Sequence, residues 1–175
     1  MLTPPDRRIA KLESHGVPPP FLRALDDLRA HADLGLVVRP PEAAYFYLPG
    51  VCDARAGLAG REVTPVCDGV NGDVFDVLLS GEDGSRFVRL ALEDDGILED
   101  FGADFRIPLA HLLIALYESS PLGVAELSAL GERIGFAPAG ALFEALERAD
   151  AQGLRASFEA DRAWRRLDLR RIVEG

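Results

Sequence analysis

The chain has few of the residues that form metal sites and disulfides, and it lacks long apolar runs. Of its 175 residues, two are cysteine, three are histidine, one is methionine and one is tryptophan. No apolar run approaches the roughly 20 residues of a membrane-spanning helix. The opening residues, MLTPPDRRIAKLE, contain no apolar segment typical of a secretory signal. We therefore expect a cytoplasmic protein without a membrane span.

The two cysteines, Cys52 and Cys67, do not have the Cys-x-x-Cys spacing of redox or zinc sites. In the cytoplasm, thiols are kept reduced. The sequence thus predicts two free thiols rather than a disulfide, and it assigns neither of them a role.

Motifs that would indicate catalysis are also missing. The sequence has no GxSxG elbow, no dinucleotide-binding GxGxxG after a strand and no P-loop. His15, His31 and His111 do not have metal-ligand spacing with one another or with the cysteines. A nucleophilic arrangement of Cys67 with His111 is the enzymatic alternative, although nothing in the sequence pairs these residues. We predict no enzyme, no metal site and no cofactor.

The charge is negative and unevenly distributed. The net charge is −10, and residues 40–104 contain 14 acidic and 4 basic side chains. A field of one sign attracts a basic partner and repels nucleic acid, and it also favours solubility. The middle of the chain is therefore the first place to look for a surface that binds a basic protein.

Residues 61–95 predict a strand, a tight turn and a hairpin. An apolar run from Val63 to Val66 leads into the turn 68–73, where Gly72 can adopt a positive φ. The runs 74–79 and 87–92 flank the short loop 81–84, which is the spacing of two antiparallel strands.

The rest of the chain predicts mostly helices. Spacing of apolar residues favours a first helix that stops at Gly16, a second from Phe21 to near Gly35, and later helices over about 108–118, 124–134 and 138–151. Gly135 and Gly153 stand at C-cap positions. Short strands are expected over 36–39 and 45–48, an acidic connector over 93–104, and either a two-strand ribbon or a helix over 154–173.

The order of elements in residues 1–118 resembles the SUKH superfamily. Three segments carry the resemblance: Val17-Pro18-Pro19-Pro20-Phe21-Leu22, the stretch 63–75 (VTPVCDGVNGDVF), and Asp104-Phe105 before an apolar helix. The family's Tyr/Asn-Gly-Gly ending of its second helix is replaced here by Ala32-Asp33-Leu34-Gly35. The resemblance implies an α+β domain, with an antiparallel sheet flanked by helices. It also implies a function by protein contact, chiefly as a bacterial immunity protein that neutralises a toxin domain, and it supplies no catalytic residues.

Residues 119–175 are expected to form a mostly helical C-terminal extension of this domain. The order of elements over about 105–175 resembles a winged helix, with Asp161-Arg162-Ala163-Trp164-Arg165-Arg166 in the place of a basic wing. The would-be recognition helix, 138–149, offers Glu144, Glu147 and Arg148 but no Asn or Gln for base edges. Nucleic acid is thus an improbable partner, and a winged-helix transcription regulator with an N-terminal sensing domain is the alternative function.

Our leading hypothesis is a non-enzymatic binding protein that occludes a basic toxin domain. Its acidic surface would steer the partner, and buried aromatic residues would supply much of the affinity. The oligomeric state and the identity of the toxin stay open. The expected partner-binding residues are Tyr45, Tyr47, Asp68, Asp73, Asp76, Glu93, Asp94, Asp95, Glu99 and Asp100.

Overall fold

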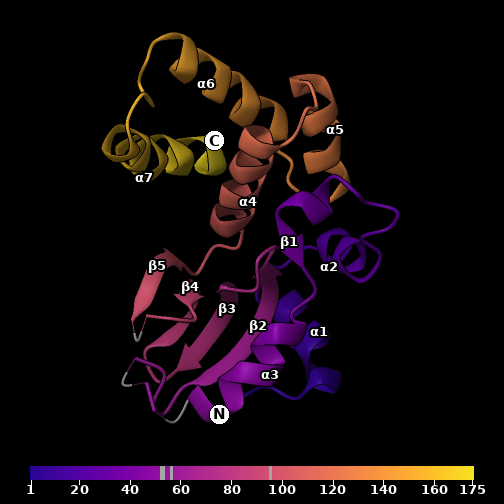
Figure 1. Cartoon of the computed structure of the whole chain (residues 1–175), viewed down its shortest axis with the longest axis vertical. Helices are drawn as coiled ribbons and strands as arrows, with labels where there is room; N and C mark the ends of the chain where they lie inside the picture. The colour runs from indigo at the N-terminus through magenta and orange to yellow at the C-terminus, as the bar shows by residue number, and fades with distance from the viewer. Residues whose placement is uncertain (52–53, 56, 95) are drawn as a thin grey trace.

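The computed structural model describes residues 1–51, 54–55, 57–94 and 96–175, apart from the side chains of 46–49 and 51. It has an α+β fold, in which a sheet and the N-terminal helices lie at one end and the C-terminal helices at the other (Figure 1). In chain order the elements are α1 (Pro5–Ser14), α2 (Pro19–Asp26), a 3-10 turn (Leu34–Leu36), β1 (Val38–Arg39), α3 (Glu42–Val51), β2 (Glu62–Gly69), β3 (Val74–Gly81), β4 (Gly84–Ala91), β5 (Ile97–Gly102), α4 (Arg106–Ser119), α5 (Val124–Arg133), α6 (Ala139–Ala151) and α7 (Phe158–Glu174).

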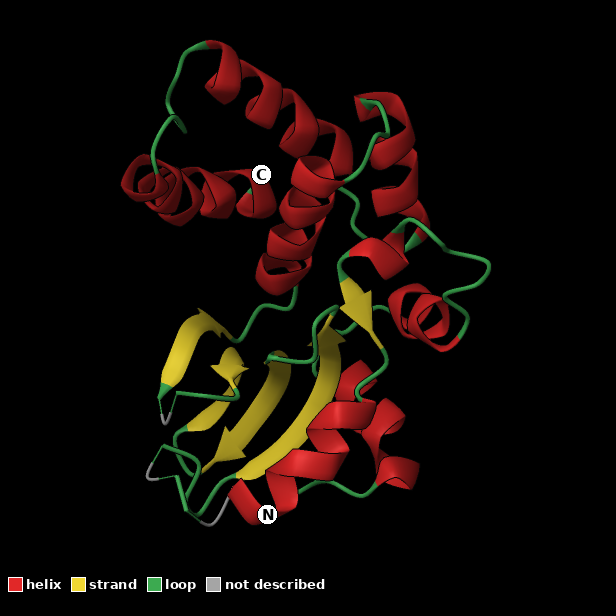
Figure 2. Ribbon diagram, viewed as in Figure 1, coloured by secondary structure: helices red, strands yellow, loops and turns green. Residues whose placement is uncertain are grey.

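The described strands form one antiparallel sheet in the order β1-β2-β3-β4-β5 (Figure 2). The predicted turn and hairpin are confirmed. Gly72 has φ +70°, and its N–H donates to the carbonyl of Gly69 to close the β2–β3 turn. Gly81 pairs with Gly84, so β3 and β4 are joined by a tight two-residue turn.

Apolar side chains cover both faces of the sheet. Because successive strand residues point to opposite faces, Val77 and Leu79 of β3 pack beneath Ala44 of α3, whereas Leu78 faces the larger cluster on the other side. That larger cluster continues without interruption from the N-terminal helices through α4 to Trp164 of α7. Burial on both faces explains why Val77, Leu78 and Leu79 of β3 are all apolar rather than alternating with polar residues.

Three local predictions are corrected by the structure. The expected strand 45–48 lies within α3, and the expected connector 93–104 contains strand β5, which pairs with β4. The second helix ends at Asp26 rather than near Gly35, and the Asp27 side chain accepts a hydrogen bond from the N–H of Ala30 in the following turn.

The tail is helix α7 and forms no ribbon. Ser157 caps its first turn by accepting a hydrogen bond from the N–H of Ala160. The proposed basic wing, 161–166, is therefore the first half of a helix. None of the described helices has the length and apolar character needed to span a bilayer.

Candidate functional site

Two acidic turns lie side by side at one end of the sheet. The N–H of Leu92, at the end of β4, donates to the carbonyl oxygen of Asp73, just before β3, over 2.8 Å. Asp73 therefore neighbours Glu93 and Asp94, and all three are exposed. We call these three residues the acidic sheet end. Within the described chain, no arginine or lysine lies within ion-pair distance of them.

The turns that present these carboxylates are held by their own hydrogen bonds. The Asp94 carboxylate accepts from the N–H of Gly96 over 2.9 Å, which fixes the β4–β5 turn. On the inner side, Arg55 donates to the carbonyl oxygens of Ala91 and Leu92 over 3.0 and 2.9 Å. The charges are thus displayed by an ordered backbone.

A shallow pocket of about 310 Å³ adjoins the acidic sheet end, between the β2–β3 turn and the start of α3. Pro40 and Val70 give it apolar surface, and Val70 is 40% exposed. The exposed Glu42 adds a further carboxylate at its rim. An apolar side chain of a basic partner could enter here while its charges meet the acidic sheet end.

Asp68 lies beside this pocket, but it is not a surface charge as the sequence suggested. Its side chain is buried, and one carboxylate oxygen accepts hydrogen bonds from the N–H groups of Ala43 and Ala44 at 2.8 and 3.4 Å. Asp68 thereby caps the start of α3 from a distant strand. The other oxygen, Oδ1, has no hydrogen-bond partner in the described structure. Burial raises the pKa of Asp68 to about 6.

Asp76 is also internal, which corrects its assignment to a partner-binding surface. Arg89, opposite it on β4, donates to both carboxylate oxygens at 2.7 and 2.8 Å. The guanidinium carbon of Arg89 also lies 5.5 Å from the centre of the Phe101 ring. This bidentate pair connects β3, β4 and β5 on the face of the sheet nearest α4.

Glu99 and Asp100 lie on β5, away from the acidic sheet end. Asp100 is exposed and pairs with Arg86 at 3.2 Å. Glu99 is partly buried, with its carboxylate 3.7 Å from Nδ1 of His111. Burial, aided by the nearby positive charges of Arg165 and Arg89, lowers the pKa of His111 to about 3, so that histidine is neutral at physiological pH.

Two tyrosines, Tyr45 and Tyr47, were expected to anchor the partner, and the structure describes the side chain of the first. Tyr45 is half-buried on α3, and its hydroxyl is enclosed without a hydrogen-bond partner in the described structure. It therefore packs within the protein. The side chain of Tyr47, and Asp95 and Cys52 entirely, lie outside the described residues. Of the expected partner-binding residues that the structure describes, Asp73, Glu93 and Asp94 come together as an exposed group.

The pairing of Cys67 with His111 does not form in the structure. Cys67 is buried with a free thiol that lies 4.0 Å from the Asp76 carboxylate, and burial raises its pKa well above the usual range. His111 instead contacts the ring of Phe101 at 5.0 Å. Within the described residues no cluster of three or more metal-ligating side chains is found. The expectation that the chain is not an enzyme stays a prediction.

Comparisons with family models, curated proteins and solved structures find no match to this chain.

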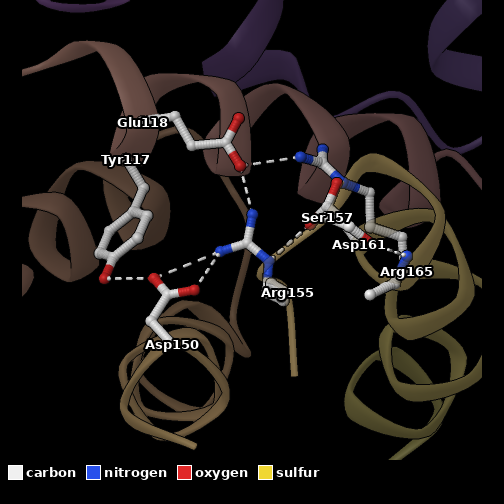
Figure 3. A network of polar contacts seen from close by, with 8 residues as sticks. Tyr117, Glu118, Asp150, Arg155, Ser157, Asp161 and Arg165 are labelled. Atoms are coloured by element: carbon white, nitrogen blue, oxygen red, sulfur yellow. Dashed lines mark hydrogen bonds and ion pairs between the residues drawn. The ribbon is translucent and has the colours of Figure 1, made fainter. Parts of the chain in front are cut away.

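The sequence reasoning missed a network of ion pairs centred on Arg155 (Figure 3). The Arg155 side chain is 6% exposed, and its guanidinium contacts the carboxylates of Glu118, Asp150 at 3.1 Å and Asp161 at 2.6 Å. It also lies over the Trp164 ring, 5.4 Å from the centroid. Because the three carboxylates come from different elements, the network holds α4, α6 and α7 together.

A second feature that was missed is a basic stripe on α7, formed by Arg162, Arg166 and Arg170. The three residues recur at intervals of four, which places them on one face of a helix. The spacing is visible in the sequence, but it indicates a stripe only if the segment is a helix, and the sequence alone is compatible with either a ribbon or a helix there.

Proposed function

We propose that the protein is a non-catalytic binding module that docks on a basic protein surface through its acidic sheet end, Asp73, Glu93 and Asp94. The observation that supports this most strongly is that these carboxylates are exposed and adjacent, and have no ion-pair partner among the described residues. Neighbouring like charges destabilise a folded protein slightly. Such a group is therefore explained better by a partner of opposite charge than by the stability of the fold.

The partner we propose is a toxin domain, with this chain acting as a bacterial immunity protein. The SUKH resemblance of residues 1–118 motivates this choice, because members of that family act chiefly by binding and neutralising toxins. The mechanism would be occlusion, in which the acidic sheet end covers a basic, substrate-binding face of the toxin. Complementary charge would accelerate association, and burial of apolar groups in the pocket beside Val70 would slow dissociation.

Co-expression with the product of the adjacent gene tests this function. We expect a stable one-to-one complex on affinity capture, and restored growth of cells that produce the toxin. A variant that carries Asp73→Asn, Glu93→Gln and Asp94→Asn should rescue growth less well than the wild type. A matched variant with Glu132→Gln, Glu144→Gln and Glu147→Gln, whose charges lie on α5 and α6, should rescue normally.

The result that contradicts the proposal is the absence of both complex and rescue. Retention of the protein on genomic DNA fragments, falling steeply with salt, would instead support the winged-helix regulator.

A further inference from the structure

A cleft of about 250 Å³ opens between β5, the first turns of α4, and α7. Its floor is apolar, with Phe101 and Leu169 buried and Ile107 partly buried. One wall is the basic stripe of α7, Arg162, Arg166 and Arg170, and the other is formed by β5 with Glu99. This volume suits a small molecule rather than a folded segment.

The basic stripe is unusual in a protein of net charge −10. All three arginines are exposed, and none has a carboxylate within ion-pair distance in the described part of the chain. The neighbouring Arg165 differs, since it is held by Asp161 at 2.6 Å and Glu118 at 2.8 Å. The chain thus neutralises the arginine that positions α7. Of the three others that line the cleft, Arg162 lies over the Phe158 ring, 5.8 Å from its centroid, and Arg166 and Arg170 are the ones left to bind an anion.

Both walls of the cleft are attached to α4: Phe101 of β5 packs on the ring of His111, with centroids 5.0 Å apart, and α7 is held at two points. At one end of α4, Arg165 of α7 pairs with Glu118. At the other end, Arg106 donates to the carbonyl oxygen of Val173 over 2.8 Å. On its inner side α7 buries Trp164 and Leu169 in the core. A site held at both ends is already formed before a ligand enters, which reduces the entropy lost on binding.

The chemistry of the walls restricts the ligand. Guanidinium groups match phosphate oxygens in paired hydrogen bonds. On the opposite side, the Glu99 carboxylate would repel a second anionic group, and both Glu99 and the neutral His111 can accept hydrogen bonds from hydroxyl or amino groups. A polyanion that filled the cleft would place its charges against Glu99. The ligand should therefore carry its negative charge at one end only.

We propose that this cleft binds a small phosphate ester, with the phosphate on Arg166 and Arg170 and a hydroxyl or amino end toward Glu99. The site is separate from the acidic sheet end and does not depend on the proposed partner. Small phosphate esters that fit the description include mononucleotides and sugar phosphates.

Calorimetric titration of the full chain with AMP and with glucose 6-phosphate, at about 0.15 M salt, tests this proposal. We expect at least one of them to bind with a Kd of about 1 mM or tighter. An Arg166→Gln/Arg170→Gln variant should bind at least about tenfold more weakly, because it loses the charge-assisted hydrogen bonds. An Arg29→Gln/Arg148→Gln variant removes two exposed arginines outside the cleft and should bind as the wild type does.

A second readout does not depend on the variants. In amide NMR spectra of the wild type, the ligand should shift signals from the residues around Phe101 and Leu169. The proposal is overturned if neither ester binds, if both double variants lose affinity equally, or if the shifts lie elsewhere. It is also overturned if a short single-stranded oligothymidylate binds more tightly than either ester, since that would indicate a nucleic-acid surface.

Discussion

Leu92 donates its backbone N–H to the carbonyl oxygen of Asp73, and this one hydrogen bond makes neighbours of two acidic turns that are distant in the sequence. The first turn ends at Asp73, directly before β3, and the second begins at Leu92, directly after β4. Because β3 and β4 are paired along their whole length, the two turns are held at the same end of the sheet. The exposed charge that we propose as a docking surface is thus a direct consequence of the hairpin register.

We expect the stability of the folded protein to depend on pH through Asp68. Burial raises its pKa to about 6, so the folded protein favours the neutral acid. Its contribution to stability is therefore fully present below the ordinary pKa and is lost as the pH rises through about 6. Asp68→Asn mimics the neutral form and keeps an oxygen to accept from Ala43. Between pH 4 and pH 8 the stability of this variant relative to the wild type should rise by about 2–3 kcal/mol.

Urea denaturation at several pH values measures this difference. A relative stability that is constant with pH would show that the carboxylate is not disfavoured by burial. As a control, Asp6→Asn changes an exposed aspartate of α1 and should leave the pH profile unchanged.

We expect the contributions of Asp76 and Arg89 to the unfolding free energy to be strongly coupled. Asp76→Ala leaves the guanidinium largely buried without its counter-charge and should cost about 3 kcal/mol of unfolding free energy. Replacing both, with Asp76→Ala and Arg89→Met, should cost less than the sum of the two single changes. The pair Arg86–Asp100, which is more exposed, is a control on the same sheet, where Asp100→Ala should cost less than about 1 kcal/mol.

Chemical denaturation of the four proteins of this double-mutant cycle gives the coupling. Equal costs for Asp76→Ala and Asp100→Ala would contradict the structural role that we assign to Asp76 and would return it to the list of candidate surface residues.

We expect Arg155 to stabilise the packing of the C-terminal helices. Arg155→Met removes a buried cation from three carboxylates and should destabilise the protein by about 3 kcal/mol. Arg155→Lys should recover only part of this, because an ammonium cannot contact several carboxylates as a planar guanidinium does. Arg148→Met, at an exposed position on α6, should change stability by less than about 0.5 kcal/mol.

The cost of Arg155→Met should also depend on pH. Although burial alone would raise the pKa of Asp161, the hydrogen bonds from Arg155 and Arg165 outweigh it, and the pKa is lowered. The stability that this carboxylate supplies is present above about pH 4 and is lost as the pH falls further. Thermal unfolding of wild type and variant should therefore converge at low pH, and a difference that stays constant into acid would count against the network.

Elements with strong local signals could be predicted from the sequence, and those decided by distant contacts could not. The run Val77-Leu78-Leu79 and the turn glycines were sufficient for the β3–β4 hairpin. By contrast, residues 45–48 are apolar and aromatic, which favours a strand locally. They lie in helix α3, whose first N–H groups are capped by Asp68 from a different strand. No local pattern contains that information.

The candidate site shows the same division. The sequence marked Asp68 and Asp76 as surface charges because burial is not visible in composition. The Asp76–Arg89 pair could nevertheless be predicted from the β3–β4 turn, since counting equally back from Gly81 and forward from Gly84 places the two residues opposite each other. The burial of Asp68, and the adjacency of Glu99 to His111, depend on how helices pack on the sheet.

The central claim is that Asp73, Glu93 and Asp94 form the surface that docks on a basic partner. Its most direct test is the association rate with the captured partner, measured over a range of salt concentrations for the wild type and for the Asp73→Asn/Glu93→Gln/Asp94→Asn variant. We expect association of the variant to be at least about tenfold slower at low salt and nearly independent of salt, with dissociation little changed. Association rates that match those of the wild type at every salt concentration would contradict the account.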